Sequence, residues 1–166
     1  MEQGYAEALD FYTREVSMRY YDWENNRLEF TEPSGKKFDL EFRGNKTIVG
    51  GFSGVGKTYL VDLISKIKGV KNNNKVVDNI FVLSEDNKYR LLNGEIKHML
   101  VIIDRGDILL DENIVDSINR DFNTNRYLIF IRKPVGLEIT PNHSATFINE
   151  NNVIRLHYDF SVKGWG

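Results

Sequence analysis

The chain has 166 residues, a formal net charge of −2 at pH 7 and 41% apolar residues. This length is enough for a single domain with a substantial core. The slightly acidic balance gives no support to a generally basic nucleic-acid-binding surface, and the absence of cysteine excludes disulfides and thiol chemistry. The lack of cysteine fits a cytoplasmic protein. No apolar run approaches the roughly 18 residues of a membrane helix, so we expect no membrane span.

The first quarter of the chain predicts a helix followed by a hairpin. Aromatic and apolar residues recur at helical spacing near residues 3–20, which favours a helix that packs on the body of the protein. Polar and apolar residues then alternate over 27–31 and 37–42, on either side of a turn at 33–36, which predicts an antiparallel hairpin. The stripe of the first helix consists of Tyr5, Leu9, Tyr12, Val16 and Tyr20.

Residues 51–58 read Gly-Phe-Ser-Gly-Val-Gly-Lys-Thr and match the pattern G-x-x-x-x-G-K-[ST] at every fixed position. A predicted strand at 46–50 precedes the motif and helical spacing over 59–68 follows it, as a phosphate-binding loop requires. In such a loop, backbone N–H groups and the positive end of the helix hold phosphate oxygens. A glycine-rich turn without a ligand is the alternative. The predicted nucleotide-contacting residues are Gly51, Ser53, Gly54, Val55, Gly56, Lys57, Thr58 and Tyr59.

Two acidic residues follow the apolar run at 99–103, which predicts a strand buried on both faces. Asp104 ends this run and is the candidate ligand for Mg²⁺, together with the hydroxyl of Thr58. Asp107 is either a catalytic base or a helix cap, because carboxylates before a helix accept its free N–H groups. The sequence also predicts that Asp111 caps a helix near 112–122.

The second half of the chain predicts further strands. Residues 76–83 look like a strand and 127–131 form an apolar run typical of a buried strand, whereas 84–98 fit either a hairpin or a short helix. Arg132 follows the run at 127–131 and is the candidate group for neutralising charge on a terminal phosphate, although a solvated basic pair with Lys133 is the alternative. Strands at 145–149 and 153–160 are expected to form an antiparallel edge of the sheet.

The loop at 51–58 and the strand ending in Asp104 resemble the Walker A and Walker B elements of P-loop NTPases, particularly those of the AAA and ABC type. The resemblance implies a three-layer α/β fold with a mainly parallel sheet and the nucleotide at the C-terminal ends of its strands. It implies ATP and Mg²⁺ as cofactors and Lys57, Asp107 and Arg132 as candidate catalytic residues. Arg105 stands where this family usually has a glutamate that polarises the attacking water, so the resemblance implies nucleotide binding more directly than hydrolysis.

The expected organisation is one nucleotide-binding domain. Its parts are a helix (1–25), a hairpin (26–45), a core (46–160) and a tail (161–166). Three functions remain open: an Mg-dependent ATP-binding protein that acts as a nucleotide-gated switch for a protein partner or in self-association, with or without slow ATPase activity; a small-molecule kinase; and a non-catalytic interaction module. The chain has no N-K-x-D motif for reading guanine, which favours adenine.

Overall fold

The computed structural model describes residues 20–32, 34–50, 60–62, 64–65, 79–133 and 135–158. The expected first helix, the phosphate-binding motif with Tyr59, and the tail at 161–166 lie outside these ranges, apart from Tyr20. The described elements are β1 (Tyr21–Asp22), β2 (Arg27–Thr31), β3 (Lys37–Glu41), β4 (Lys46–Val49), β5 (Ile80–Val82), α3 (Lys88–Leu92), β6 (Leu100–Ile103), α4 (Gly106–Leu109), α5 (Glu112–Arg120), β7 (Arg126–Phe130), the 3₁₀ turn η2 (Pro141–His143), β8 (Ser144–Glu150) and β9 (Val153–Tyr158).

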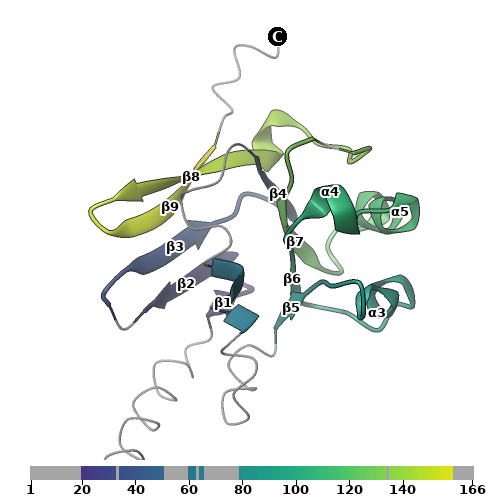
Figure 1. The fold of residues 1–166 in the computed structure, drawn as a ribbon, viewed down its shortest axis with the longest axis horizontal. Helices are drawn as coiled ribbons and strands as arrows, with labels where there is room; N and C mark the ends of the chain where they lie inside the picture. The colour runs from purple at the N-terminus through teal and green to yellow at the C-terminus, as the bar shows by residue number, and fades with distance from the viewer. Residues whose placement is uncertain are drawn as a thin grey trace, which may run out of the picture.

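The described strands form a single nine-stranded sheet in the order β1-β2-β3-β9-β8-β4-β7-β6-β5 (Figure 1). The strands from β8 to β5 run parallel to one another, and β3 is parallel to β9. The pairs β1–β2, β2–β3 and β8–β9 are antiparallel. The sheet is therefore mixed, with its parallel strands gathered on one side.

The central strands are apolar because both of their faces are covered. All four residues of β6 are buried, and they alternate between two clusters: Leu100 and Ile102 face one, Val101 and Ile103 the other. Side chains of a strand point alternately to opposite faces of the sheet, so a continuous apolar run is what a strand between two apolar layers requires.

Short helices cover one face of the parallel strands. Figure 1 shows α3, α4 and α5 on the same side of β4, β7, β6 and β5. The residues Ile114 and Ile118 of α5 are fully buried in the cluster that also holds Val101 and Ile103. These two positions lie four residues apart, on the same side of the helix, which explains why α5 buries this face.

The opposite face packs against helical residues after β4 and against the hairpin. Leu60 and Ile64, which lie in helical residues after β4, share a cluster with Ile102 and with Leu28 and Leu40 of the hairpin. The two ends of the sheet also meet, since the Nδ2 of Asn79, before β5, donates to the carbonyl oxygen of Tyr21 in β1 at 2.5 Å. The sheet therefore curls toward a barrel.

The expected three-layer fold with a mainly parallel sheet is wrong. The finding that overturns it is the nine-stranded mixed sheet. The helices α3, α4 and α5 beside it have only five, four and nine residues. The physical reason lies in the hairpin. Its second strand, β3, pairs with β9 through Lys37–Val153, Phe38–Ile154 and Asp39–Arg155, and so the hairpin becomes part of the same curled sheet.

The expected antiparallel edge at the C-terminal strands is also wrong. The antiparallel pairing of β8 and β9 is confirmed, yet both strands lie inside the sheet because β8 also pairs with β4 and β9 with β3. Other local expectations are confirmed: β2 and β3 form a hairpin, and β4, β6 and β7 are buried strands. The ambiguous stretch 84–98 contains the short helix α3.

Candidate functional site

The parallel strands β4, β7 and β6 lie side by side, so their carboxyl ends come together. We call this end of the strands the carboxyl edge of the sheet. Val49 is paired with Phe130, and Ile103 with Ile129, so the strands end within one residue of one another. The residues that follow are Gly50, Ile131 and Asp104. Ligands of parallel sheets bind outside the carboxyl ends of the strands, and this edge is therefore the first place to look for a site.

Asp104 is half-buried at this edge. Its Oδ1 accepts a hydrogen bond from the backbone N–H of Arg105 at 2.9 Å, which fixes the carboxylate beside the end of β6. Among the described residues no other partner of this carboxylate is found, so the second oxygen is available to a cation. A hard cation such as Mg²⁺ takes oxygen ligands of this kind, and the donor fits the expected metal.

The sheet order places β7 between β4 and β6. Neighbouring strands lie about 4.8 Å apart, so the ends of β4 and β6 are separated by about 10 Å. A ligand that touches both strands must therefore cross the end of β7, which carries Arg132. The strand that ends before Asp104 is therefore not the direct neighbour of the strand that precedes the phosphate-binding motif.

Arg105 changes the direction of the chain after Asp104. It adopts a left-handed conformation with φ 55° and precedes α4, and its side chain is exposed. The next residue, Gly106, is buried against the end of β7: a Cβ there would lie 1.8 Å from Ile131 Cγ2 and 3.2 Å from the carbonyl oxygen of Phe130. Only glycine permits this close approach, which seats α4 directly on β7.

Asp107 and Arg132 come together at the same edge. The Oδ1 of Asp107 accepts a long hydrogen bond, 3.4 Å, from the backbone N–H of Arg132. The guanidinium of Arg132 is exposed and makes no hydrogen bond or ion pair within the described part of the chain, and the same holds for the ammonium of Lys133. Two of the three predicted catalytic residues are therefore neighbours, with side chains that face solvent.

The remaining predicted residues, from Gly51 to Tyr59 and including Lys57 and Thr58, lie outside the described residues. The elements on either side are described. The strand β4 ends at Val49, and residues 60–62 and 64–65 are helical, with Leu60 and Ile64 fully buried. The strand and the helix that the motif requires are thus both confirmed.

The prediction for Asp111 is confirmed. Its Oδ1 accepts a hydrogen bond from the backbone N–H of Ile114 at 2.9 Å, which is the N-cap interaction of α5. Its other oxygen pairs with the Lys88 Nζ of α3 at 3.1 Å. These bonds lower the pKa of the Asp111 carboxyl, the bond to the Ile114 N–H being the largest cause. Asp111 therefore joins α5 to α3 and has no part in the edge site.

The aromatic residues near the start of the described chain lie at the other edge of the sheet. Trp23 stacks on His98 with 3.9 Å between ring centroids, and the guanidinium of Arg126 lies 3.9 Å from the Trp23 ring. Arg126 also donates to the carbonyl oxygen of Trp23 and to the Tyr21 hydroxyl. Tyr21 is fully buried. These side chains close β1 onto β6 and β7 and are remote from the carboxyl ends.

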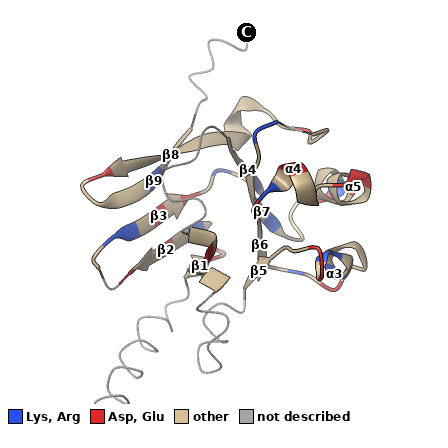
Figure 2. Ribbon diagram, viewed as in Figure 1, with Lys and Arg blue, Asp and Glu red and all other residues tan. Residues whose placement is uncertain are grey.

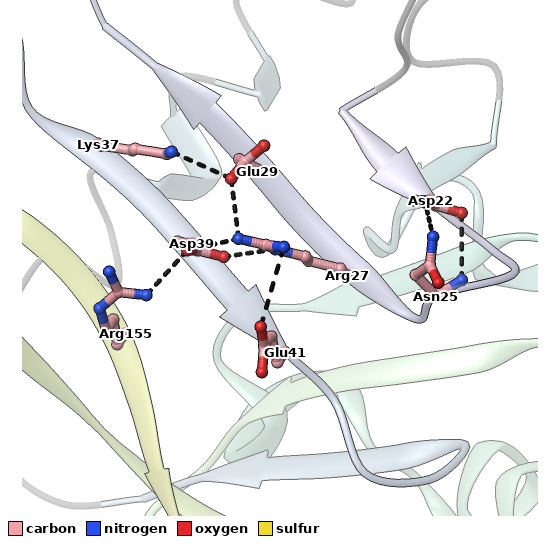
Figure 3. Close-up of polar contacts among 8 residues, drawn as sticks. All are labelled: Asp22, Asn25, Arg27, Glu29, Lys37, Asp39, Glu41 and Arg155. Carbon is pink, nitrogen blue, oxygen red and sulfur yellow. Dashed lines mark hydrogen bonds and ion pairs between the residues drawn. The ribbon is translucent and has the colours of Figure 1, made fainter.

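Sequence reasoning missed an ionic network on the outer face of β2, β3 and β9. Charged residues of both signs line β2 and β3 (Figure 2). Asp39 lies at the centre, with its side chain 3% exposed, and accepts two bonds of 2.7 Å from Arg27 and one of 2.8 Å from Arg155 (Figure 3). Glu29 bridges Arg27 and Lys37 at 3.0 Å each. The Arg27 guanidinium is the main cause that lowers the pKa of the Asp39 carboxyl.

A groove lies at the opposite edge of the sheet from Asp104. It has a volume of about 630 Å³ and runs between α5 and the segment before β6, over the buried side chains of Leu91, Ile96 and Tyr127. Its rim carries charges of both signs, including Lys97, Asp116 and Arg120. Because the groove carries both positive and negative side chains, its charge favours neither anionic nor cationic ligands. The carboxyl ends of the strands beside Asp104 are therefore the better candidate site.

Comparison with known proteins found no matching family model, no similar curated protein and no matching solved structure. Within the described ranges, no group of three or more His, Cys, Asp or Glu side chains is placed to hold a metal ion on its own. None of the described helices has both the length and the apolar character needed to cross a bilayer. The case for a function therefore depends on the edge and the motif next to it.

Proposed function

We propose that this protein binds Mg·ATP at the carboxyl ends of β4, β7 and β6. The observation that carries the proposal is the junction of the motif at 51–58 with β4 on one side and buried helical residues on the other. A phosphate-binding loop needs this strand and this helix, because the backbone N–H groups then converge on one point. The half-buried carboxylate of Asp104 at the same edge is the second support.

Each group at this edge has a distinct task in the proposal. Lys57 supplies a positive charge to the phosphates, and the Thr58 hydroxyl and Asp104 carboxylate are the oxygen ligands of Mg²⁺. The bound metal would neutralise phosphate charge. Arg132 follows β7, which lies between β4 and β6, and its guanidinium, which has no partner among the described residues, is suited to a terminal phosphate.

We propose binding with slow or no hydrolysis. Arg105, in the position of the usual glutamate, has an exposed cationic side chain and cannot act as a base. A protein that binds ATP without rapid turnover is suited to act as a switch, in which the nucleotide changes a surface offered to a partner. The proposed location is the cytoplasm, where ATP is available and proteins fold without disulfides.

Isothermal titration calorimetry with Mg·ATP and Mg·GTP tests this proposal. We expect binding by the parent protein, a preference for ATP, and a loss of affinity of at least tenfold in Lys57→Ala, because a charge-assisted phosphate contact is removed. Asp104→Asn should weaken the dependence on Mg²⁺ more than the affinity for free ATP. Lys88→Ala on α3 is the matched control and should bind normally. Unchanged affinity in Lys57→Ala would refute the phosphate site.

A further inference from the structure

The turn after Asp104 rests on the end of β7 through Gly106. The missing Cβ of Gly106 brings the first turn of α4 against Ile131 and the carbonyl oxygen of Phe130. Interiors are closely packed, so a displacement at one of these segments is transmitted to the other. The position of α4 and that of the segment after β7 are thus linked by direct contact.

Hydrogen bonds hold the segment after β7 both at its start and further along. At its start, the N–H of Arg132 donates to Asp107 Oδ1 at 3.4 Å. Further on, Asn119 of α5 donates from Nδ2 to the carbonyl oxygen of Gly136 at 3.1 Å and accepts from the N–H of Glu138 at 2.9 Å. The far end is therefore held by two bonds of ordinary length. At the near end, the N–H of Ile131 donates to the carbonyl oxygen of Val49 at 3.3 Å, and the bond from the N–H of Arg132 itself is the long one to Asp107.

We infer that Asp107 is a positioning residue, which sets the backbone at Arg132 so that the Arg132 guanidinium reads the terminal phosphate of the nucleotide. This inference rests on the proposed function. Through Asp107, the loop that begins at Asp104 and the segment that carries Arg132 move as one unit. A nucleotide that has a γ-phosphate is then distinguished from one that lacks it by the placement of Arg132.

The same contact gives Asp107 a task other than that of a catalytic base. A base would use the other carboxylate oxygen, Oδ2, within hydrogen-bond reach of the attacking water. Here Oδ1 faces the end of β7 and accepts from the backbone, which is a task that needs an acceptor but no negative charge. An asparagine at this position would keep an acceptor oxygen, whereas an alanine would not.

The test compares Asp107→Asn and Asp107→Ala with the parent protein. Hydrogen exchange at the Arg132 amide, measured by NMR without nucleotide, reports the contact itself. The ratio of ATP affinity to ADP affinity, measured by calorimetry with Mg²⁺, shows how strongly the protein prefers a nucleotide with a γ-phosphate. Asp116→Ala, which removes an exposed carboxylate from α5, is the control. The thermal unfolding midpoint of each variant shows whether it is folded.

We expect Asp107→Ala to speed exchange at Arg132 and to reduce the ATP to ADP ratio, each by about fivefold, the effect of losing one hydrogen bond. Asp107→Asn should keep both values near those of the parent. Unchanged exchange in Asp107→Ala, an unchanged ratio despite faster exchange, or equal loss in Asp107→Asn and Asp107→Ala would each overturn the inference. If the parent protein bound neither ATP nor ADP, the proposed function itself would be refuted, and so would the proposed role of Arg132 in distinguishing the two nucleotides.

Discussion

Replacing Asp39 with asparagine tests how the hairpin is joined to the rest of the sheet. Asp39 lies on β3, Arg27 on β2 and Arg155 on β9, so one carboxylate connects three strands. Asparagine has nearly the same size, and the change removes the charge without leaving a cavity. The two guanidinium groups then lose the anion between them.

The magnitude follows from the burial of the groups. Loss of one partner of a fully buried ion pair costs about 3–5 kcal/mol, whereas an exposed pair contributes about 0.2–1 kcal/mol. Asp39 is buried, but the side chains of Arg27 and Arg155 are 38% and 45% exposed and can turn to water. We therefore expect a loss of about 2–3 kcal/mol in the free energy of unfolding.

Urea denaturation at pH 7 measures this loss, with Glu41→Gln as the control. Glu41 contacts Arg27 at 3.9 Å with its side chain 72% exposed, so this variant should lose less than about 0.5 kcal/mol. The pKa of Asp39 is lowered in the folded protein, so its contribution is present above the unfolded pKa and is lost as pH falls through the folded value. The difference between parent and Asp39→Asn should thus shrink below about pH 4. Equal stability of the two variants at pH 7 would refute the network's role.

Three further predictions concern stability. Burial lowers the pKa of His143, so the unfolded chain binds a proton at a higher pH than the folded protein does. The free energy of unfolding should therefore fall as the pH drops below about 6.5, and His143→Gln should reduce this dependence in denaturation curves measured at a series of pH values. Gly106→Ala should lose about 1–3 kcal/mol in urea denaturation because its Cβ meets Ile131, whereas Gly44→Ala, which meets no atom within 4 Å, should stay near the parent. Asp111→Ala should lose about 1 kcal/mol in the same assay through loss of the helix cap, and an unchanged midpoint would contradict that role.

The sequence predicted those features that depend on neighbours along the chain. The strand with Asp104 was recognisable because a strand buried on both faces must be apolar throughout. The cap at Asp111 was recognisable because a carboxylate before a helix accepts its free N–H groups. Both follow from a few adjacent residues.

The errors concern contacts between distant segments. Alternation along β3 shows which side chains face outward, but it does not show that Asp39 meets Arg155, 116 residues away. The strand β3 pairs in parallel with β9, which lies far away in the sequence. This pairing makes the hairpin a part of the curled sheet, and no pattern within the hairpin reveals it. At the candidate site, the hydrogen bond to Asp107 from the backbone of Arg132, which follows β7, joins two residues 25 positions apart, and local spacing does not show such a contact.

The most direct test of the nucleotide site is the paramagnetic effect of Mn·ATP on the amide signals of the protein. Manganese replaces Mg²⁺ at oxygen ligands and broadens nearby resonances. We predict that the amides of Asp104, Arg105 and Arg132 broaden first and that Lys57→Ala abolishes the effect. Broadening centred on the groove near Ile96 and Arg120, at the other edge of the sheet, would contradict the proposal.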